Sequence, residues 1–187
     1  MPFAQEMRNT EMRVNRRERT LLIVGAGGLG QDVAEIAMMS GRYAKIAFLD
    51  DQPTPEKERQ YPIVGKVSEL EKFVGVYGYA ISAVGNNEYR MKMHNEIKRH
   101  GFDIPILIHP TAIVHPLAML SPGDIIRAMC FVSGGVEVGE SVLLNIGCKI
   151  DHNCILGDGC HISMGTVVRN EVTVPPFSGF RSNAVVE

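Results

Sequence analysis

A glycine-rich segment in the first part of the chain has the spacing of a phosphate-binding turn. Gly25, Gly27 and Gly30 occupy the glycine positions of a G-x-G-x-x-G sequence, and Asp50 follows Gly30 by 20 residues. Backbone N–H groups at a helix N-terminus suit a phosphate, and a carboxylate at that distance suits a ribose hydroxyl. The motif alone leaves three interpretations open: a nucleotide-sugar site, a nicotinamide dinucleotide site, or a tight turn without a ligand.

A histidine between an acid and an amide is the second group that could do chemistry. His152 stands between Asp151 and Asn153, and His161 follows nine residues later. A neutral imidazole takes a proton from an attacking amine or hydroxyl, and it works best when a partner orients its ring. Asp151, Asn153 or Asp158 could be that partner. Simpler interpretations remain, namely an exposed turn residue for His152 and a packing residue for His161.

The residues around the glycine loop predict a parallel sheet. Short apolar runs predict three strands, at 20–24, 45–49 and 79–84. Helical patterns between them indicate a parallel arrangement, in which ligands bind beyond the carboxyl ends of the strands. The glycine loop follows the first strand, Asp50 and Asp51 follow the second, and Gly85, Asn86 and Asn87 follow the third. We therefore expect all three groups to lie at one edge of the sheet.

From about Ile108 onward the sequence repeats every six residues. Every sixth residue is large and apolar: Ile108, Val114, Leu120, Ile126, Val132, Val138, Leu144, Ile150, Leu156, Ile162, Val168, Val174, Phe180 and Val186. Four residues after each stands a mostly small residue, in a set that also contains Asp124. One short strand per hexad, with three hexads to a coil, predicts a triangular parallel β-helix whose coils stack about 4.8 Å apart.

Counting in sixes also assigns positions to individual residues. The four cysteines are 18, 6 and 6 residues apart, which predicts reduced thiols in the core and not a metal site. Gly139, Gly157 and their neighbours are expected at corners that need unusual backbone angles. His152 comes two residues after the inward Ile150 and should point outward. His161 lies half a coil later, on the opposite side of the prism, so the two histidines could meet only across a subunit interface.

The overall composition excludes several classes of partner. The 187 residues are 45% hydrophobic and 21% charged, with a net charge of −2, so no basic field attracts nucleic acid or anionic lipid. No apolar run approaches the roughly 18 residues of a membrane span, and no signal peptide is apparent. We expect a cytoplasmic protein with a mobile arm at 1–19, a nucleotide-binding domain at 20–107 and a β-helix at 108–187.

Five segments together resemble the sugar O- and N-acetyltransferases of the NeuD/PglD type. They are VGAGGLG at 24–30, FLDD at 48–51, AVGNNEYRMK at 83–92, LIHPTAIVHP at 107–116 and IDHNCILGDGCHIS at 150–163. The resemblance covers about residues 21–174. It implies an α/β plus all-β protein, with a small Rossmann-like parallel-sheet domain followed by a left-handed parallel β-helix. It also implies a homotrimer, acetyl-CoA as the donor, a UDP-linked amino sugar as the acceptor, and no metal.

The resemblance also implies roles for particular residues. His152 would be the general base, with Asp151 and Asn153 beside it, and Asn145 would fix the acceptor. The nucleotide sugar would be held by Gly25, Gly27, Gly28, Asp50, Asp51, Gly85, Asn86, Asn87 and Arg90. Acetyl-CoA would be contacted by His161 and Asn170. Asn170 lies one coil after His152, where relatives often have a glycine whose amide faces the thioester oxygen.

Two further departures from the family pattern affect the functional prediction. Leu29 stands where relatives usually have a histidine, and relatives continue for about two more coils that help to hold coenzyme A. The predicted function is acetyl transfer from acetyl-CoA to an amine or hydroxyl of a nucleotide-activated or sialic-acid-like sugar. The alternatives are a non-catalytic or truncated trimeric nucleotide-sugar binder and, on the glycine loop alone, an NAD(P)-binding enzyme.

Overall fold

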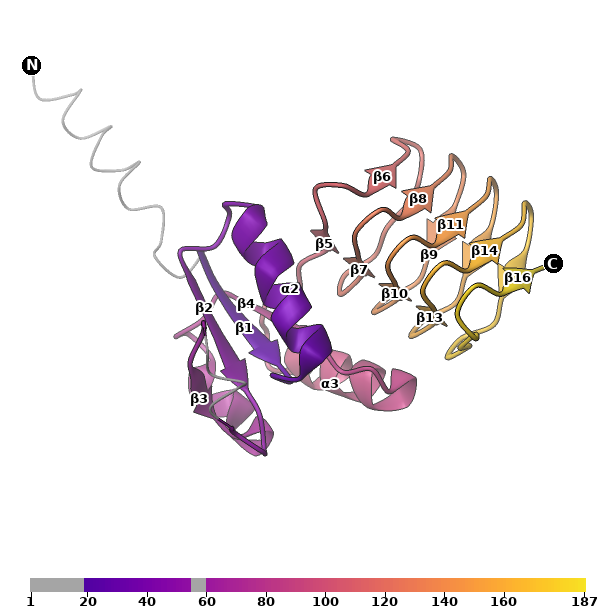
Figure 1. The fold of residues 1–187 in the computed structure, drawn as a ribbon. Coiled ribbons are helices and arrows are strands. Elements are labelled where there is room, and N and C mark those ends of the chain that lie inside the picture. Colours follow the sequence, from indigo (N-terminus) through magenta and orange to yellow (C-terminus); the bar gives the residue numbers. More distant parts are fainter. Residues whose placement is uncertain (1–18, 55–59) are drawn as a thin grey trace, which may run out of the picture.

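The computed structural model describes residues 19–54 and 60–187 (Figure 1). Apart from Arg19, the arm predicted for residues 1–19 lies outside these ranges. A parallel sheet with helices on both sides forms the first part of the described chain. A column of short stacked strands forms the second part (Figure 1).

The sheet has four parallel strands in the order β3-β2-β1-β4. Their bounds are Thr20–Val24 (β1), Lys45–Leu49 (β2), Ile63–Gly65 (β3) and Tyr79–Ser82 (β4). The helical elements are α2 (Gly28–Met39), the 3-10 helix η2 (Val67–Phe73) and α3 (Asn87–Arg99). Strands β1 and β2 have the predicted bounds, and β4, which is the third predicted strand, ends two residues earlier than predicted. The sequence did not predict β3 or η2.

The central strand β1 is buried on both faces, which explains its continuous apolar run. Leu21 and Ile23 pack in one cluster with α2, while Leu22 and Val24 pack in another with α3. Successive side chains of a strand point to opposite faces, so a strand covered on both sides is apolar at successive positions, here residues 21–24. Because β1 lies between β2 and β4 in a parallel sheet, the carboxyl ends of these three strands are neighbours.

The second part is a left-handed parallel β-helix with three faces. The first face contains β5 (Leu107–Ile108), β7 (Ile125–Ile126), β10 (Leu143–Leu144) and β13 (His161–Ile162). The second face contains β6 (Ile113–Val114), β8 (Phe131–Val132), β11 (Lys149–Ile150), β14 (Val167–Val168) and β16 (Val185–Val186). The third face contains β9 (Glu137–Val138), β12 (Ile155–Leu156) and β15 (Thr173–Val174).

The strand register confirms the 18-residue coil. Leu144 pairs with Ile126 on one side and with Ile162 on the other. The second residue of each central strand points inward, and these residues form one continuous buried cluster with the four cysteines. All four thiols are free, and the sulfurs of Cys130 and Cys148 lie 3.4 Å apart on successive coils. The cysteines are therefore core residues, as predicted.

The corners differ from the prediction for Gly139 and Gly157. Positive φ angles recur at every sixth residue, at Gly123, Met129, Gly135, Ser141, Gly147, Asn153, Gly159, Gly165, Glu171, Phe177 and Asn183. Gly139 and Gly157 are not among them, so the predicted reason was wrong. A Cβ on Gly139 would lie 2.7 Å from the backbone N of Asp158, and one on Gly157 would lie 2.5 Å from that of Pro176. These positions need glycine because the next coil passes too close for a side chain.

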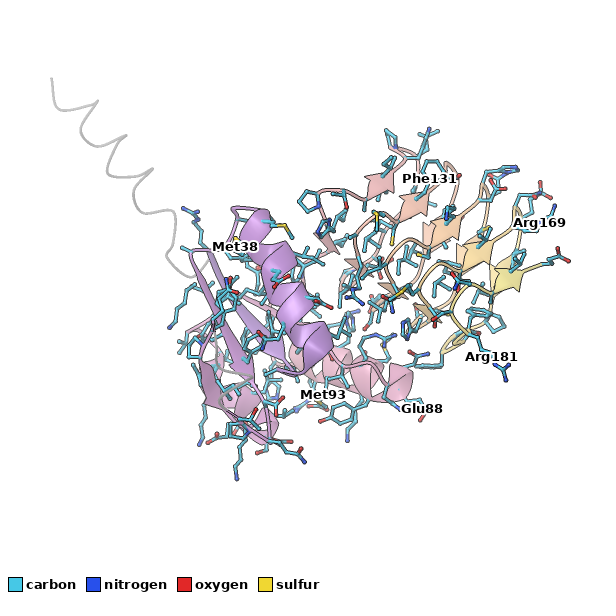
Figure 2. All side chains as sticks on the ribbon, in the orientation of Figure 1. Met38, Glu88, Met93, Phe131, Arg169 and Arg181 are labelled. Atoms are coloured by element: carbon cyan, nitrogen blue, oxygen red, sulfur yellow. The ribbon has the colours of Figure 1, made fainter. Side chains whose placement is uncertain are left out.

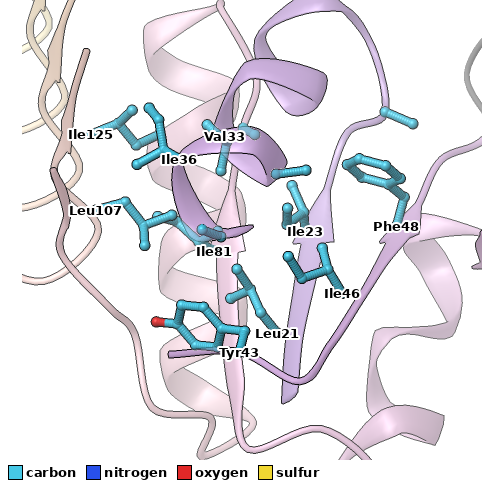
Figure 3. Close-up of a cluster of buried hydrophobic side chains, with 14 of the residues drawn as sticks. Leu21, Ile23, Val33, Ile36, Tyr43, Ile46, Phe48, Ile81, Leu107 and Ile125 are labelled. Carbon is cyan, nitrogen blue, oxygen red and sulfur yellow. The ribbon is translucent and has the colours of Figure 1, made fainter. Parts of the chain in front are cut away.

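The two parts of the chain share a core. In the first face the outward residues Leu107, Ile125 and Leu143 are also apolar, and they are buried in the same cluster as Val33 and Ile36 of α2 (Figure 3). The helix α2 thus packs against the sheet on one side and the β-helix on the other. This packing fixes the sheet edge that carries the predicted nucleotide site relative to the first face.

Candidate functional site

Two glycines of the loop are required by the fold, and two are not. Gly25 has a φ of +100°, and a Cβ on Gly30 would lie 2.0 Å from the carbonyl oxygen of Gly25. By contrast, Gly27 and Gly28 are exposed, and a Cβ on either would meet no atom within 4 Å. A tight turn without a ligand would explain why Gly25 and Gly30 are glycines, but not why Gly27 and Gly28 are. Glycines with open space beside them, at the N-terminus of α2, suit the close approach of a ligand to the backbone.

The acidic pair lies beside this loop, at the carboxyl end of β2. One carboxylate oxygen of Asp50 accepts a hydrogen bond from the backbone N–H of Ala26 at 2.8 Å. Its other oxygen accepts one from Gln52, also at 2.8 Å. The exposed Asp51 accepts a hydrogen bond from the N–H of Val67 at 2.9 Å. The structure therefore brings the acidic pair and the glycine loop together.

The Gly85–Asn86–Asn87 turn follows β4 at the same edge and also contacts the β-helix. The Asn86 side chain caps α3 by accepting a hydrogen bond from the N–H of Tyr89 at 2.9 Å. The Asn87 amide donates to the carbonyl oxygens of Phe177 and Ser178, at 2.9 and 3.1 Å. The turn, Glu88, Phe177 and His161 line an open hollow of about 410 Å³. This hollow joins the sheet edge to the first face.

Arg90 does not have the predicted nucleotide-binding role. It is completely buried, and burial lowers its pKa to about 10. Its guanidinium donates to oxygens of both parts of the chain: Val84, Gly85 and the Asn87 side chain on one part, and Ser141, Gly159 and Cys160 on the other. A guanidinium has five N–H donors, so these contacts leave none for a ligand. The residue ties α3 to the β-helix.

Replacing Arg90 should therefore destabilise the fold. The change Arg90→Met keeps the apolar stem but leaves several buried oxygens without a donor. We expect the free energy of unfolding to fall by about 3 kcal/mol, because each unsatisfied buried group costs roughly 1–3 kcal/mol. Urea unfolding followed by circular dichroism measures this change. Arg99→Met, at an exposed arginine paired with Glu96, is the matched control. Equal effects of the two variants would contradict the assignment.

His152 is exposed at the corner between the second and third faces, opposite the first face. The residues predicted to orient its ring have other roles in this chain. Asp151 accepts a hydrogen bond from the backbone N–H of His152 at 2.8 Å, and Asn153 occupies the corner position with a φ of +58°. Asp158 accepts from the N–H of Glu140, one corner away. Among the described residues of a single chain, none hydrogen-bonds to the His152 imidazole.

Asn170 lies at the same corner as His152, one coil further along. The N–H of the next residue, Glu171, donates to the carbonyl oxygen of His152 at 3.0 Å. Asn170 is exposed, as is His152. The structure therefore brings the predicted base and one of the two predicted contacts of acetyl-CoA to the same corner on successive coils.

Asn145 and His161 lie together on the opposite side of the prism. The Asn145 amide is 3.1 Å from Nε2 of His161, although the sequence assigned the two residues to different substrates. Two residues that sequence reasoning missed continue this contact. Arg127 donates to Oδ1 of Asn145 at 2.6 Å, and it forms an ion pair with Asp32 of α2. Arg127 precedes Asn145 by one coil, so the 18-residue repeat could have found it, but no sequence pattern connects it to Asp32.

Residues 19–54 and 60–187 support neither a metal site nor a membrane-spanning helix. They contain no cluster of three or more His, Cys, Asp or Glu side chains that could hold a metal ion. None of their helices is both long and apolar enough to cross a membrane.

Comparisons with known proteins agree with this architecture. Residues 20–97 match the PglD N-terminal domain family, and residues 135–170 match the bacterial transferase hexapeptide family. The acetyltransferase domain of PglB from Neisseria gonorrhoeae is 31% identical, with a TM-score of 0.82 over 90% of this chain and 91% of that chain. The same domain in complex with acetyl coenzyme A is 28% identical, with a TM-score of 0.81 over 90% of this chain and 93% of that chain.

A curated relative is UDP-N-acetylbacillosamine N-acetyltransferase from Bacillus subtilis. It is 33% identical over 113 residues, which are 59% of this chain and 52% of that protein. The chain thus spans about half the length of this relative. Taken with the fold and the five matching segments, these similarities identify the class: a Rossmann-like domain joined to a hexapeptide-repeat β-helix. The chain belongs to the NeuD/PglD-type family of sugar acetyltransferases.

Proposed function

We propose that the protein transfers an acetyl group from acetyl-CoA to the amine or hydroxyl of a nucleotide-activated or sialic-acid-like sugar. The observation that carries this proposal is the 31% identity to the PglB acetyltransferase domain over 90% of this chain. A complex of that domain with acetyl coenzyme A and the name of the Bacillus relative support the donor and the acceptor class. In this proposal residues 20–107 bind the nucleotide sugar and residues 108–187 form the acyltransferase domain.

His152 is the proposed general base. Its exposed position at a corner of the β-helix lets the imidazole reach a substrate outside the prism. As the amine or hydroxyl attacks the thioester carbonyl, the imidazole takes the nucleophile's proton. The new C–N or C–O bond forms, the C–S bond breaks, and the imidazolium returns a proton to the leaving thiolate. Asn170, at the same corner, is a proposed contact of acetyl-CoA.

The nucleotide part of the acceptor is proposed to lie along the sheet edge. The exposed backbone at Gly27 and Gly28 would receive phosphate oxygens, because helix N-termini attract anions. Asp50 and Asp51 are the carboxylates beside this loop and are proposed to accept hydrogen bonds from sugar hydroxyls in addition to those they already accept from the backbone. The hollow beside the Gly85–Asn86–Asn87 turn continues this edge toward His161 and Asn145. The base and the nucleotide site thus lie on different sides of one chain.

This assignment makes a prediction for the glycine loop. Gly27→Ala should leave stability nearly unchanged, because its φ is −69° and the added Cβ meets open space. It should weaken UDP-sugar binding by about tenfold, since a methyl group then lies between the backbone and the phosphate. Isothermal titration calorimetry measures the affinity. Gly30→Ala should instead destabilise the fold by about 3 kcal/mol through overpacking. Unchanged affinity in Gly27→Ala would place the nucleotide elsewhere.

A homotrimer completes this proposal. Most outward residues of the second face are apolar, with Ile113 62%, Phe131 44% and Val185 61% exposed, and Lys149 stands between Phe131 and Val167. Met129 and Met164 add to this apolar surface at the adjoining corner. Exposed apolar patches of this kind mark protein contacts, and identical subunits close into a ring when each contributes such a patch to a head-to-tail contact with the next. The face adjoins the His152 corner, so packing through it could bring His152 of one subunit to the nucleotide site of another. We also propose a cytoplasmic location, in line with the four reduced thiols.

The experiment that tests the proposed function follows thiol release from acetyl-CoA in the presence of UDP-linked amino sugars, with His152→Ala as the control. Thiol release above background that requires both the sugar and His152 is the expected result. Background release with retained UDP-sugar binding would support the non-catalytic binder instead. Binding of NADH without binding of UDP-sugars would support the nicotinamide alternative.

A further inference from the structure

Four polar side chains form a connected row between the glycine-loop helix and the hollow. Asp32 of α2 forms an ion pair with Arg127, which donates to Oδ1 of Asn145 at 2.6 Å. The Asn145 amide in turn lies 3.1 Å from Nε2 of His161. The row crosses the junction between the two parts of the chain, and the functional prediction uses only its last two members.

The surroundings of Asn145 fix the orientation of its amide. Oδ1 lies 2.6 Å from Nη1 of Arg127 and 2.8 Å from the backbone N–H of Ile146. Both of these groups are donors and cannot accept. The atom facing them must therefore be the oxygen, and the –NH₂ group must face His161. Asp32 pairs with the guanidinium and so keeps Arg127 on the oxygen side of Asn145.

This orientation determines the protonation of His161. Because an –NH₂ group faces it, Nε2 must be the acceptor, so the ring is neutral and carries its proton on Nδ1. Burial lowers the pKa of His161, and the charges of Arg90 and Arg127 lower it further. Glu88 is the acidic residue among those that line the hollow with His161. No hydrogen bond from Nδ1–H to another described residue is present, which leaves this donor for a ligand in the hollow.

We propose that Arg127 and Asp32 are positioning residues that hold His161, through Asn145, as a neutral Nδ1–H donor. His161 would then bind an acceptor oxygen of a substrate and would not compete with His152 as a base. The substrate role rests on the proposed acetyl transfer. The protonation state does not, because it follows from the contacts of this chain alone.

Nuclear magnetic resonance of the full chain with ¹⁵N-labelled histidine tests the protonation state without a substrate. Two-bond ¹⁵N–¹H correlations distinguish the two neutral tautomers, and loss of one signal set in a His161→Gln variant assigns it. We expect the Nδ1–H tautomer at neutral pH and a titration midpoint below that of an exposed histidine. An Nε2–H tautomer or a charged ring at neutral pH would overturn the proposal.

Two variants test the row itself. Arg127→Gln should give a mixture with the Nε2–H tautomer and a higher titration midpoint, since Asn145 is free to turn and a nearby positive charge is lost. Asn145→Asp should invert the tautomer, because a carboxylate oxygen then faces Nε2. Arg127→Lys, which keeps a donor-only cation, should restore much of the wild-type pattern. Arg169→Gln, at an exposed arginine paired with Glu187, is the matched control and should change nothing. An unchanged tautomer in Asn145→Asp would overturn the proposal even if Arg127→Gln does not fold.

Kinetics then separate positioning from a purely structural role. For Arg127→Gln we expect kcat to fall by about tenfold and its pH profile to shift, with a smaller change in KM. Arg127→Lys should recover part of the loss. A variant with altered tautomer but unchanged kcat and pH profile would show that His161 plays no part in the reaction. Lack of activity in the wild type with all sugars would count against the proposed function and not against the tautomer.

Discussion

His152→Ala is expected to lower the rate of acetyl transfer by about 10²–10⁴-fold, the usual contribution of a general base. The exposed imidazole is the group that can receive the nucleophile's proton at the corner where Asn170 also lies. Its removal leaves the attacking amine or hydroxyl to lose that proton to water. Binding of the nucleotide sugar should be retained, because the glycine loop and acidic pair lie on the other side of the chain. Steady-state thiol release and calorimetric binding measure the two effects.

A matched control for this prediction is His115→Ala. His115 is also exposed and follows a strand of the second face at the same corner, two coils earlier. It should keep nearly all of the activity. Transfer at the wild-type rate by His152→Ala would mean that another group accepts the proton. Equal losses in the two variants would point to damage of the corner and not to chemistry.

Phe131→Asp is expected to separate the subunits and to abolish most of the transfer activity. Phe131 points outward from β8 on the second face (Figure 2), and Ile113 is the outward residue that pairs with it one coil earlier. A carboxylate in a subunit interface is costly, because burying a charge costs several kcal/mol even where Lys149 on the next coil offers a partner. If the active site needs two subunits, dissociation removes activity although each chain remains folded. Light scattering or sedimentation measures the mass, and thiol release measures the activity.

The third face provides the control for this surface variant. Ile155 is 46% exposed and occupies the equivalent outward position in β12. Its outward neighbours on adjacent coils, Glu137 and Thr173, are both polar, whereas Phe131 has the apolar Ile113 on one of its two sides. Ile155→Asp should therefore remain trimeric and active. If Ile155→Asp dissociates while Phe131→Asp remains a trimer, the interface lies on the third face and the proposed second-face interface is contradicted.

The β-helix could be predicted well because its information is local and repeated. Each hexad fixes one inward residue, and the repeat of 18 aligns residues such as Leu144 and Ile162 without any knowledge of distant contacts. Individual glycines were harder to interpret. Gly139 and Gly157 follow the repeat, but the reason for them is a close contact with the next coil. The positive φ angles of the corners occur instead at other residues, and several of these residues are not glycine.

The sequence could predict those parts of the site whose positions follow from the order of the parallel strands. Parallel strands bring the glycine loop, the acidic pair and the Gly85–Asn86–Asn87 turn to one edge. The role of Arg90 could not be predicted, because its partners Ser141 and Gly159 belong to a distant part of the chain. Asp151 shows a different limit. Its position beside His152 suggested an orienting carboxylate, but a tight corner turns the carboxylate to the backbone N–H.

A mixed-subunit experiment tests most directly whether the active site is shared. His152 and His161 lie on opposite sides of one chain, so a shared site takes one histidine from each of two subunits. His152→Ala and His161→Ala subunits, each nearly inactive alone, are co-expressed with different tags, and the mixed trimers are isolated. We expect these trimers to regain activity, with about one third of their sites intact in a cyclic trimer. Mixed trimers no more active than either variant alone would contradict a site that combines His152 and His161 from different subunits.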